Sequence, residues 1–192
     1  MEKKILILLS CTLPFFTSSY AQHKKNELVK DSILDNRDQK EYKMVKIGST
    51  TWMAENLKWE CDGSFIYEDL PKNLKKFGRL YSYEAAQNAC PASTHLPTKQ
   101  DWDSLQYYAD PKNEGIAGEK LMKKTKPGFA ATLSGYKNAK GKYVALEEEG
   151  DYWGADITVY FTGQMQNVAF KINDAIQKRD FKNCYSIRCV KD

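Results

Sequence analysis

The clearest pattern of hydrophobic and polar positions lies in the middle of the chain and predicts two helices. The hydroxyl of Ser82 is placed to cap a short helix that stops at Cys90 and the proline after it. Thr98, followed three residues later by Asp101, predicts a capping box at the start of a second helix. Apolar positions at helical spacing predict the buried face of this second helix, which consists of Trp102, Leu105 and Ala109.

Runs of β-branched and aromatic residues predict antiparallel strands before and after these helices. Near the start, residues 43–47 and 50–57 flank Gly48-Ser49, a two-residue connection with glycine first, which predicts a type II′ hairpin. Residues 61–76 mix turn residues with aromatics and predict a loop. In the last third we expect four strands, namely Val159 to Thr162, Val168 to Ile172, Ala175 to Phe181 and Tyr185 to Val190. The pattern therefore predicts a mixed α+β fold.

Residues 1–21 have the organisation of a secretory signal peptide. A basic start is followed by the apolar stretch Ile5 to Phe16 and by small residues up to Ala21, after which we expect cleavage. The apolar stretch is shorter than the roughly 20 residues of a membrane-spanning helix, so no membrane span is expected. The protein is therefore predicted to be exported to the periplasm, the cell surface or the medium. An alternative is a lipoprotein anchored through Cys11.

The rest of the chain divides into a charged linker and one domain. Residues 22–42 are highly charged with little apolar content and predict a solvated linker. Residues 43–192 have the length of a single domain with one core. The formal net charge is +4, and acidic residues are scattered among the basic ones, so the composition does not indicate a nucleic-acid-binding protein.

Removal of the signal peptide leaves four cysteines, an even number that in an exported protein predicts disulfides. They are Cys61, Cys90, Cys184 and Cys189. If residues 185–190 form one strand, Cys184 and Cys189 point to opposite faces and lie roughly 16 Å apart. These two cysteines then do not bond to each other, and each has Cys61 or Cys90 as its partner.

Five separated blocks resemble the Fibrobacter succinogenes major paralogous domain, a sequence-defined family of exported bacterial domains. The family implies no particular biochemical activity. The blocks, in chain order, are IGSTTWMAENL, GRLYSYEAAQNACP, HLPTKQDW, DYWGAD and YSIRCVKD.

The HLPTKQDW block is also similar to formylglycine-generating enzymes, whose fold is a variant of the C-type-lectin-like fold. This similarity implies two helices, a small antiparallel sheet and long loops. It further implies a disulfide between Cys90 and Cys189, which leaves Cys61 to bond to Cys184. An enzymatic alternative follows from the same family, because Cys184 and Cys189 have the spacing of its copper(I)-binding pair, and soft thiolates select copper(I). A copper-dependent thiol oxidase would need both thiols free.

Other catalytic and metal-binding patterns are not found. The sequence has two histidines, of which His23 lies in the predicted linker and His95 precedes the helix cap, where a structural role is expected. The carboxylates of Asp101 and Asp103 and of residues 147–149 are interpreted as exposed charges rather than an acid/base pair. The triplets with which C-type lectins bind calcium are missing, so we expect no metal and no cofactor.

Four aromatic residues in the lectin-like loop region are the candidates for ligand binding. Trp153, Tyr152, Tyr143 and Tyr136 would form a platform on which a glycan or peptide packs, although Trp153 in the core is the structural alternative. The predicted function is a non-catalytic exported domain that binds a carbohydrate or protein partner at the cell envelope. A purely structural envelope module is a further alternative, and the oligomeric state is not predicted.

Overall fold

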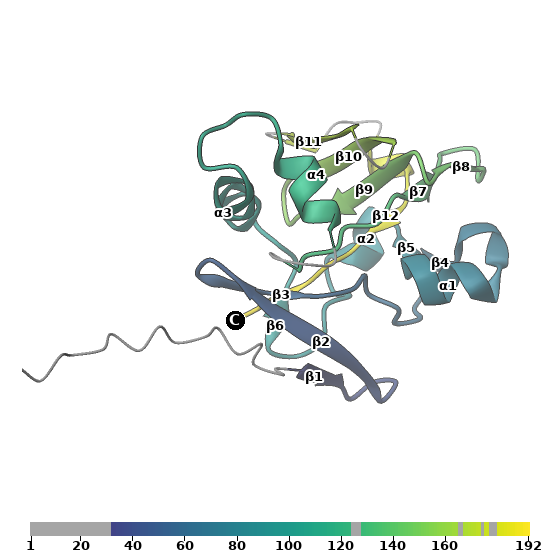
Figure 1. The fold of residues 1–192 in the computed structure, drawn as a ribbon. Helices are drawn as coiled ribbons and strands as arrows, with labels where there is room; N and C mark the ends of the chain where they lie inside the picture. The colour runs from purple at the N-terminus through teal and green to yellow at the C-terminus, as the bar shows by residue number, and fades with distance from the viewer. Residues whose placement is uncertain (1–31, 124–127, 165–166, 174, 177–179) are drawn as a thin grey trace, which may run out of the picture.

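The computed structural model describes residues 32–123, 128–164, 167–173, 175–176 and 180–192 (Figure 1). Within these ranges the chain forms two curled sheets with helices packed beside them. The predicted signal peptide and Cys11 lie outside the described residues. None of the helices within the described ranges is both long and apolar enough to span a membrane.

The smaller sheet contains five strands of the described chain in the order β1-β2-β3-β13-β6. Along β2, side chains alternate between solvent and core, so that Tyr42 and Met44 are buried while Lys43 between them is exposed. The bounds of these strands are Ser32–Asp35 for β1, Lys40–Ile47 for β2, Thr50–Met53 for β3, Thr94–His95 for β6 and Val190–Lys191 for β13.

The predicted hairpin is confirmed as β2 and β3, which pair antiparallel from Ile47 opposite Thr50. Gly48 has a φ of 64°, a conformation that glycine adopts without steric cost. The strand β1 pairs antiparallel with β2 ahead of this hairpin. Residues 32–35 and 40–42 are therefore strand residues rather than part of the linker predicted for residues 22–42.

The larger sheet contains the strands β11-β10-β9-β12-β5-β4 in that order, with β7 paired to β8 and β9. Most neighbours are antiparallel, and β12 and β7 each run parallel to β9. The bounds are Ser64–Phe65 for β4, Leu80–Tyr81 for β5, Ser134–Lys137 for β7, Tyr143–Leu146 for β8, Glu149–Trp153 for β9, Thr158–Gln164 for β10, Asn167–Ile172 for β11 and Tyr185–Ser186 for β12.

Two of the four α-helices in the described chain follow the predicted caps. In α2 (Tyr83–Ala86) the Ser82 hydroxyl accepts a hydrogen bond from the amide of Ala85, although the helix is shorter than predicted. In α3 (Lys99–Ala109) the capping box of Thr98 and Asp101 is present, and the predicted face is buried. The remaining helices are α1 (Pro71–Phe77) and α4 (Ala117–Met122).

The helix α1 occupies part of the segment for which a loop was predicted. Pro71 stands at its first position, where the missing amide hydrogen costs nothing, and Gly78 ends it with a φ of 77°. A Cβ on Gly78 would lie 2.8 Å from the Leu57 carbonyl oxygen, so only glycine fits this close approach. The loop prediction for residues 61–76 is therefore wrong over residues 71–76.

The C-terminal segment connects the two sheets instead of forming the single strand predicted over residues 185–190. It pairs with the larger sheet as β12 and with the smaller sheet as β13. Between them the carbonyl groups of Ile187 and Cys189 accept hydrogen bonds from Leu57 and Met53. The guanidinium of Arg188 is buried, where it donates to the side chain of Asn56 and to backbone carbonyls.

The strand predicted over residues 175–181 is also wrong at its end. There a 3₁₀-helix, η2 (Asp180–Lys182), begins. Residues 177–179 lie outside the described part of the chain.

Two large apolar clusters form most of the core. The first joins α3, α4 and both sheets around Trp52, Trp102 and Phe129. The second lies between the two sheets around Tyr81 and Trp153. Because residues from distant parts of the sequence share each cluster, the sheets and helices pack as one unit.

One disulfide is present in the described chain, between Cys90 after α2 and Cys189 before β13, as the lectin-like resemblance implied. The predicted bond between Cys61 and Cys184 is wrong, since both are free cysteines. Cys61 packs against the second core cluster, whereas Cys184 lies in a third, smaller cluster with Tyr67. The two cysteines therefore lie in different parts of the core. The α+β class is confirmed, with one disulfide instead of two.

Candidate functional site

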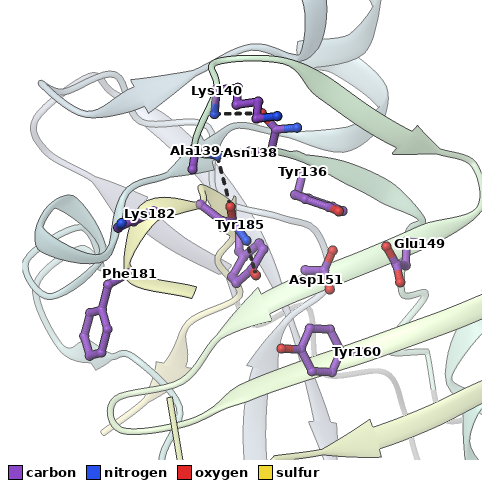
Figure 2. Close-up of a pocket in the computed structure, with 11 residues that line it drawn as sticks. Tyr136, Asn138, Ala139, Lys140, Glu149, Asp151, Tyr160, Phe181, Lys182 and Tyr185 are labelled. Atoms are coloured by element: carbon purple, nitrogen blue, oxygen red, sulfur yellow. Dashed lines mark hydrogen bonds between the residues drawn. The ribbon is translucent and has the colours of Figure 1, made fainter. Parts of the chain in front are cut away.

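A pocket of about 820 Å³ opens on the larger sheet, between its central strands and the loops that follow β7 and η2 (Figure 2). Three tyrosines line it, one from each of three strands: Tyr136 from β7, Tyr160 from β10 and Tyr185 from β12. The ring of Phe181 lies at its edge and is 43 % exposed. The size suits a ligand of one or two sugar rings or a few amino acids.

The alternation of side chains along the paired strands β9 and β10 determines which of their residues face the pocket. In β10 the neighbours of Tyr160, Val159 and Phe161, point into the first core cluster, so Tyr160 faces the other way. In β9, directly opposite Tyr160, Asp151 lines the pocket together with Glu149 two residues earlier. The strands thus place an aromatic ring and two carboxylates on one surface.

A hydrogen-bonded network fixes the deeper wall of the pocket. The hydroxyl of Tyr185 donates to Asp180 Oδ1 at 2.9 Å and accepts from Asn183 Nδ2 at 2.9 Å. Asn183 Oδ1 in turn accepts from the backbone amide of Ala139 at 3.2 Å, which ties the loop after β7 to the residues after η2 (Figure 2). The hydroxyl of Tyr160 donates to the same Asp180 oxygen at 3.4 Å.

Burial raises the pKa of the Tyr185 phenol well above its ordinary value, and the negative charges of Asp151 and Asp180 act in the same direction. Tyr185 therefore stays protonated at neutral pH and serves as a hydrogen-bond donor to Asp180. The wall of the pocket is preorganised by buried contacts rather than by flexible surface groups.

The loop between β7 and β8 has its own local support. The side chain of Asn138 accepts hydrogen bonds from the amides of Lys140 and Lys142, at 3.0 and 3.1 Å. This turn is characteristic of asparagine, whose short side chain reaches the backbone two residues on. It holds Ala139 and Lys140 at the pocket.

Comparison of the chain with protein-family models gives one match, the Fibrobacter succinogenes major domain, over residues 45–191. The chain belongs to this family. The family resemblance of the five sequence blocks is thereby confirmed. No curated protein and no solved structure matches the chain.

In this Fibrobacter succinogenes major domain, the four aromatic residues of the predicted platform lie in different environments. Trp153 and Tyr152 are fully buried, so their assignment as ligand-binding residues is wrong. The Trp153 indole donates to the Tyr81 carbonyl oxygen at 2.7 Å, and the Tyr152 hydroxyl bonds to the backbone of Thr132. Both side chains stabilise the core, which is the alternative considered for Trp153.

The other two predicted aromatics differ in position. Tyr136 lines the pocket, with its ring 5.9 Å from that of Tyr185 in an edge-on arrangement. Tyr143 is half-buried outside the pocket and packs on Tyr67 at 5.1 Å. The prediction thus located one of the residues that line the pocket.

His95 has polar partners on both sides of its ring. Its Nδ1 lies 2.7 Å from Asp192 and its Nε2 lies 3.3 Å from Asp101, the carboxylate of the capping box. The position joins the start of α3 to the end of the chain, which fits the structural role predicted.

Two of the carboxylates interpreted as exposed charges form surface ion pairs, whereas Glu149 lines the pocket. Asp103 pairs with Lys99 on α3, and Glu147 pairs with Lys76 on α1. Within the described residues there is no group of three or more histidine, cysteine, aspartate or glutamate side chains that could hold a metal ion.

Most of the pocket was missed from the sequence. The available signals were the alternation in β9 and β10 and the turn at Asn138, which together place polar residues on one side of the sheet. What the sequence did not reveal is that the segment 180–185 returns to this same surface, because that return depends on the tertiary pairing of β12 with β9 and β5.

Proposed function

We propose that the domain is a non-catalytic binding module and that the pocket on the larger sheet holds its ligand, a carbohydrate or a segment of a protein partner. The observation that carries the proposal is the combination, around one pocket, of tyrosine rings with polar groups held on strands. Ring faces pack on the apolar surface of a ligand, while fixed polar groups orient its hydroxyl, amide or charged groups.

Preorganisation supports the same proposal. Tyr185 and Asn183 are held by hydrogen bonds to each other and to Asp180, so little conformational entropy is lost when a ligand binds. Asp151 is 2 % exposed and lies on a central strand. A site built on strands holds its geometry better than one built on loops alone.

We further propose that the fold is related to the C-type-lectin-like fold and that the chain is exported. The lectin-like relation is supported by the disulfide between Cys90 and Cys189, which ties the end of the first predicted helix to the last strand. Export is supported by the same bond, since disulfides persist in oxidising compartments, and by the pattern of residues 1–21. Anchoring as a lipoprotein through Cys11 is the alternative.

The disulfide counts against the thiol-oxidase alternative. A copper(I) site built from Cys184 and Cys189 would need Cys189 as a thiolate, and its sulfur is bonded to Cys90. No observation at the pocket favours a particular reaction, and we therefore propose binding alone.

The proposal is tested with a variant that fills the pocket. Ala139 lines the pocket but is exposed, so Ala139→Trp places a large ring in the opening without disturbing the core. Glu114→Trp, at an exposed turn that does not line the pocket, is the matched control. The exported protein and both variants are applied to glycan and peptide arrays.

We expect the exported protein and the Glu114→Trp variant to share a set of bound array members that the Ala139→Trp variant loses. An unchanged set in the Ala139→Trp variant would show that binding occurs elsewhere. No binding by any of the three proteins would favour the purely structural envelope module.

A further inference from the structure

The charged residues of the pocket are separated by sign. Lys140 and Lys182 lie on the side formed by the loop after β7 and by η2, whereas Glu149 and Asp151 lie across the pocket on β9 (Figure 2). The two residues of each sign lie close together in the fold. Glu149 and Asp151 share one face of β9. Lys140 and Lys182 lie on two segments that are joined by the hydrogen bond between Asn183 and Ala139.

Three of these four side chains have charges that the protein does not neutralise by pairing. Lys140, Lys182 and Glu149 have no ion-pair partner among the described residues. Elsewhere on the described surface such pairs are present, as between Lys76 and Glu147. Lys140, Lys182 and Glu149 thus line the pocket without an ion pair in the described part of the chain, where a ligand of complementary charge would meet them.

Two of the three tyrosines, Tyr160 and Tyr136, lie on the acidic side as well. Tyr160 stands directly opposite Asp151 in the pairing of β10 with β9, and Tyr136 lines the same pocket from β7. A ring face next to a carboxylate favours a cation, since the ring quadrupole and the negative charge attract it together.

Building on the proposed function, we infer that the ligand is a peptide segment with two opposite charges, whose ammonium or guanidinium group binds at Glu149 and Asp151 and whose carboxylate binds at Lys140 and Lys182. Peptides carry both kinds of charge on side chains long enough to reach across a pocket of this size. A neutral sugar can form hydrogen bonds with these groups but gains no charge–charge attraction from them.

The inference is tested by isothermal titration calorimetry on the exported protein with four capped tetrapeptides. The first has lysine and glutamate at its ends with two glycines between them, and the others replace lysine, glutamate or both by glutamine. Cellobiose serves as a neutral sugar. We expect the peptide with both charges to bind at least about tenfold more tightly than either peptide with one, a ratio equivalent to about 1.4 kcal/mol.

Two variants assign each charge to its side of the pocket. In Glu149→Gln the preference for lysine over glutamine in the peptide is expected to fall severalfold, while the preference for glutamate remains. In the double variant Lys140→Gln/Lys182→Gln the opposite is expected. Glu148→Gln and Lys72→Gln remove exposed charges that do not line the pocket and should change neither preference.

The outcomes separate this inference from the proposed function. If the four peptides bind equally, or if cellobiose binds and the peptides do not, the inference about charge is wrong while the pocket remains a binding site. If the Ala139→Trp variant also retains every array ligand, the proposed function itself is wrong.

Discussion

At the scale of single residues, Tyr185 has the widest influence on the pocket. Its hydroxyl connects buried Asp180 with Asn183, and Asn183 holds the loop that carries Ala139. The ring also contacts Trp153 of the second core cluster at 4.6 Å. One side chain thus joins the core to the pocket wall, so that removal of its hydroxyl alone should be measurable.

We predict that Tyr185→Phe lowers the free energy of unfolding at pH 7 by about 1 to 2 kcal/mol, because Asp180 and Asn183 each lose a buried hydrogen bond. Urea unfolding followed by circular dichroism measures the change. Tyr107→Phe, on an exposed tyrosine of α3, is the control and should stay within about 0.5 kcal/mol of the wild type. Equal stability of the two variants would show that the network contributes nothing.

The wild type and the Tyr185→Phe variant should also differ in how their stability changes in alkaline solution. The pKa of Tyr185 is raised in the folded state, so below about pH 10, the ordinary tyrosine value, both states keep the proton and the hydroxyl contributes fully. Above that pH the unfolded state releases the proton first, and the free energy of unfolding falls.

Because the Tyr185→Phe variant lacks this group, its stability deficit relative to the wild type should shrink as the pH rises from 10 to 11. The slope from this group is at most about 1.4 kcal/mol per pH unit. Urea unfolding of both proteins between pH 7 and 11 measures the deficit. A deficit that grows over this range would contradict the account.

The burial of single residues could not be predicted from the sequence where it depends on which face of a sheet is covered. Trp153 and Tyr152 alternate on β9, and in a sheet with one solvated face one of them would be exposed. Both are buried because the two core clusters cover opposite faces at this end of the strand. Tyr160 and Asp151, which line the pocket, carry no signal in the sequence that sets them apart from exposed strand residues.

At the scale of elements, the packing of α4 on β11 depends on one glycine. A Cβ on Gly118 would lie 2.1 Å from the carbonyl oxygen of Val168, a distance that forces the helix and strand apart. The helix and the strand therefore approach each other more closely than any other residue at this position would allow.

We predict that Gly118→Ala lowers the free energy of unfolding by about 1 to 3 kcal/mol through overpacking. In an unpacked helix the same change would raise stability by up to about 1 kcal/mol, so the sign of the effect is the test. Urea unfolding gives the stability, and far-ultraviolet circular dichroism shows whether the helices persist. A variant as stable as the wild type, or more so, would mean that α4 does not lie so close to β11.

Elements with local signals were predicted, and elements set by distant partners were not. The capping residues Ser82 and Thr98 and the turn at Gly48 act within a few positions of themselves, so each could be read from the sequence. The segment 185–191 has the composition of one strand, yet it pairs with two sheets because its partners, β3, β5, β6 and β9, come from separate earlier parts of the chain. The start of α1 at Pro71 was a local signal that was overlooked.

At the scale of the whole molecule, the C-terminal segment holds the two sheets together. Its strands β12 and β13 pair with different sheets, and the disulfide of Cys189 joins it to Cys90 after α2. A loop of about 100 residues closed in this way contributes roughly 4 to 5 kcal/mol in the chain-entropy description. The second disulfide expected from the sequence is not needed for this connection.

The arrangement of cysteines predicts a specific labelling pattern. In the protein cleaved after Ala21, alkylation of the unfolded, unreduced chain should label Cys61 and Cys184 and leave a peptide in which Cys90 is linked to Cys189. In the folded protein at pH 8, Cys184 should react more slowly than Cys61, because it is buried and its pKa is raised to about 11. Peptide mapping by mass spectrometry gives both results, and a linked pair of Cys61 and Cys184 would restore the two-disulfide prediction.

The central claim is that the pocket on the larger sheet is the place where this family member binds a ligand. The most direct measurement is a titration of the ¹⁵N-labelled exported protein with the tetrapeptide that carries lysine and glutamate, followed by amide chemical shifts. The account predicts that the largest shifts occur at residues 138–142, 149–151 and 180–185. Largest shifts at the exposed Tyr107 and Tyr108 of α3 instead would contradict it. The absence of shifts at millimolar peptide would contradict the inference about the charges of the ligand.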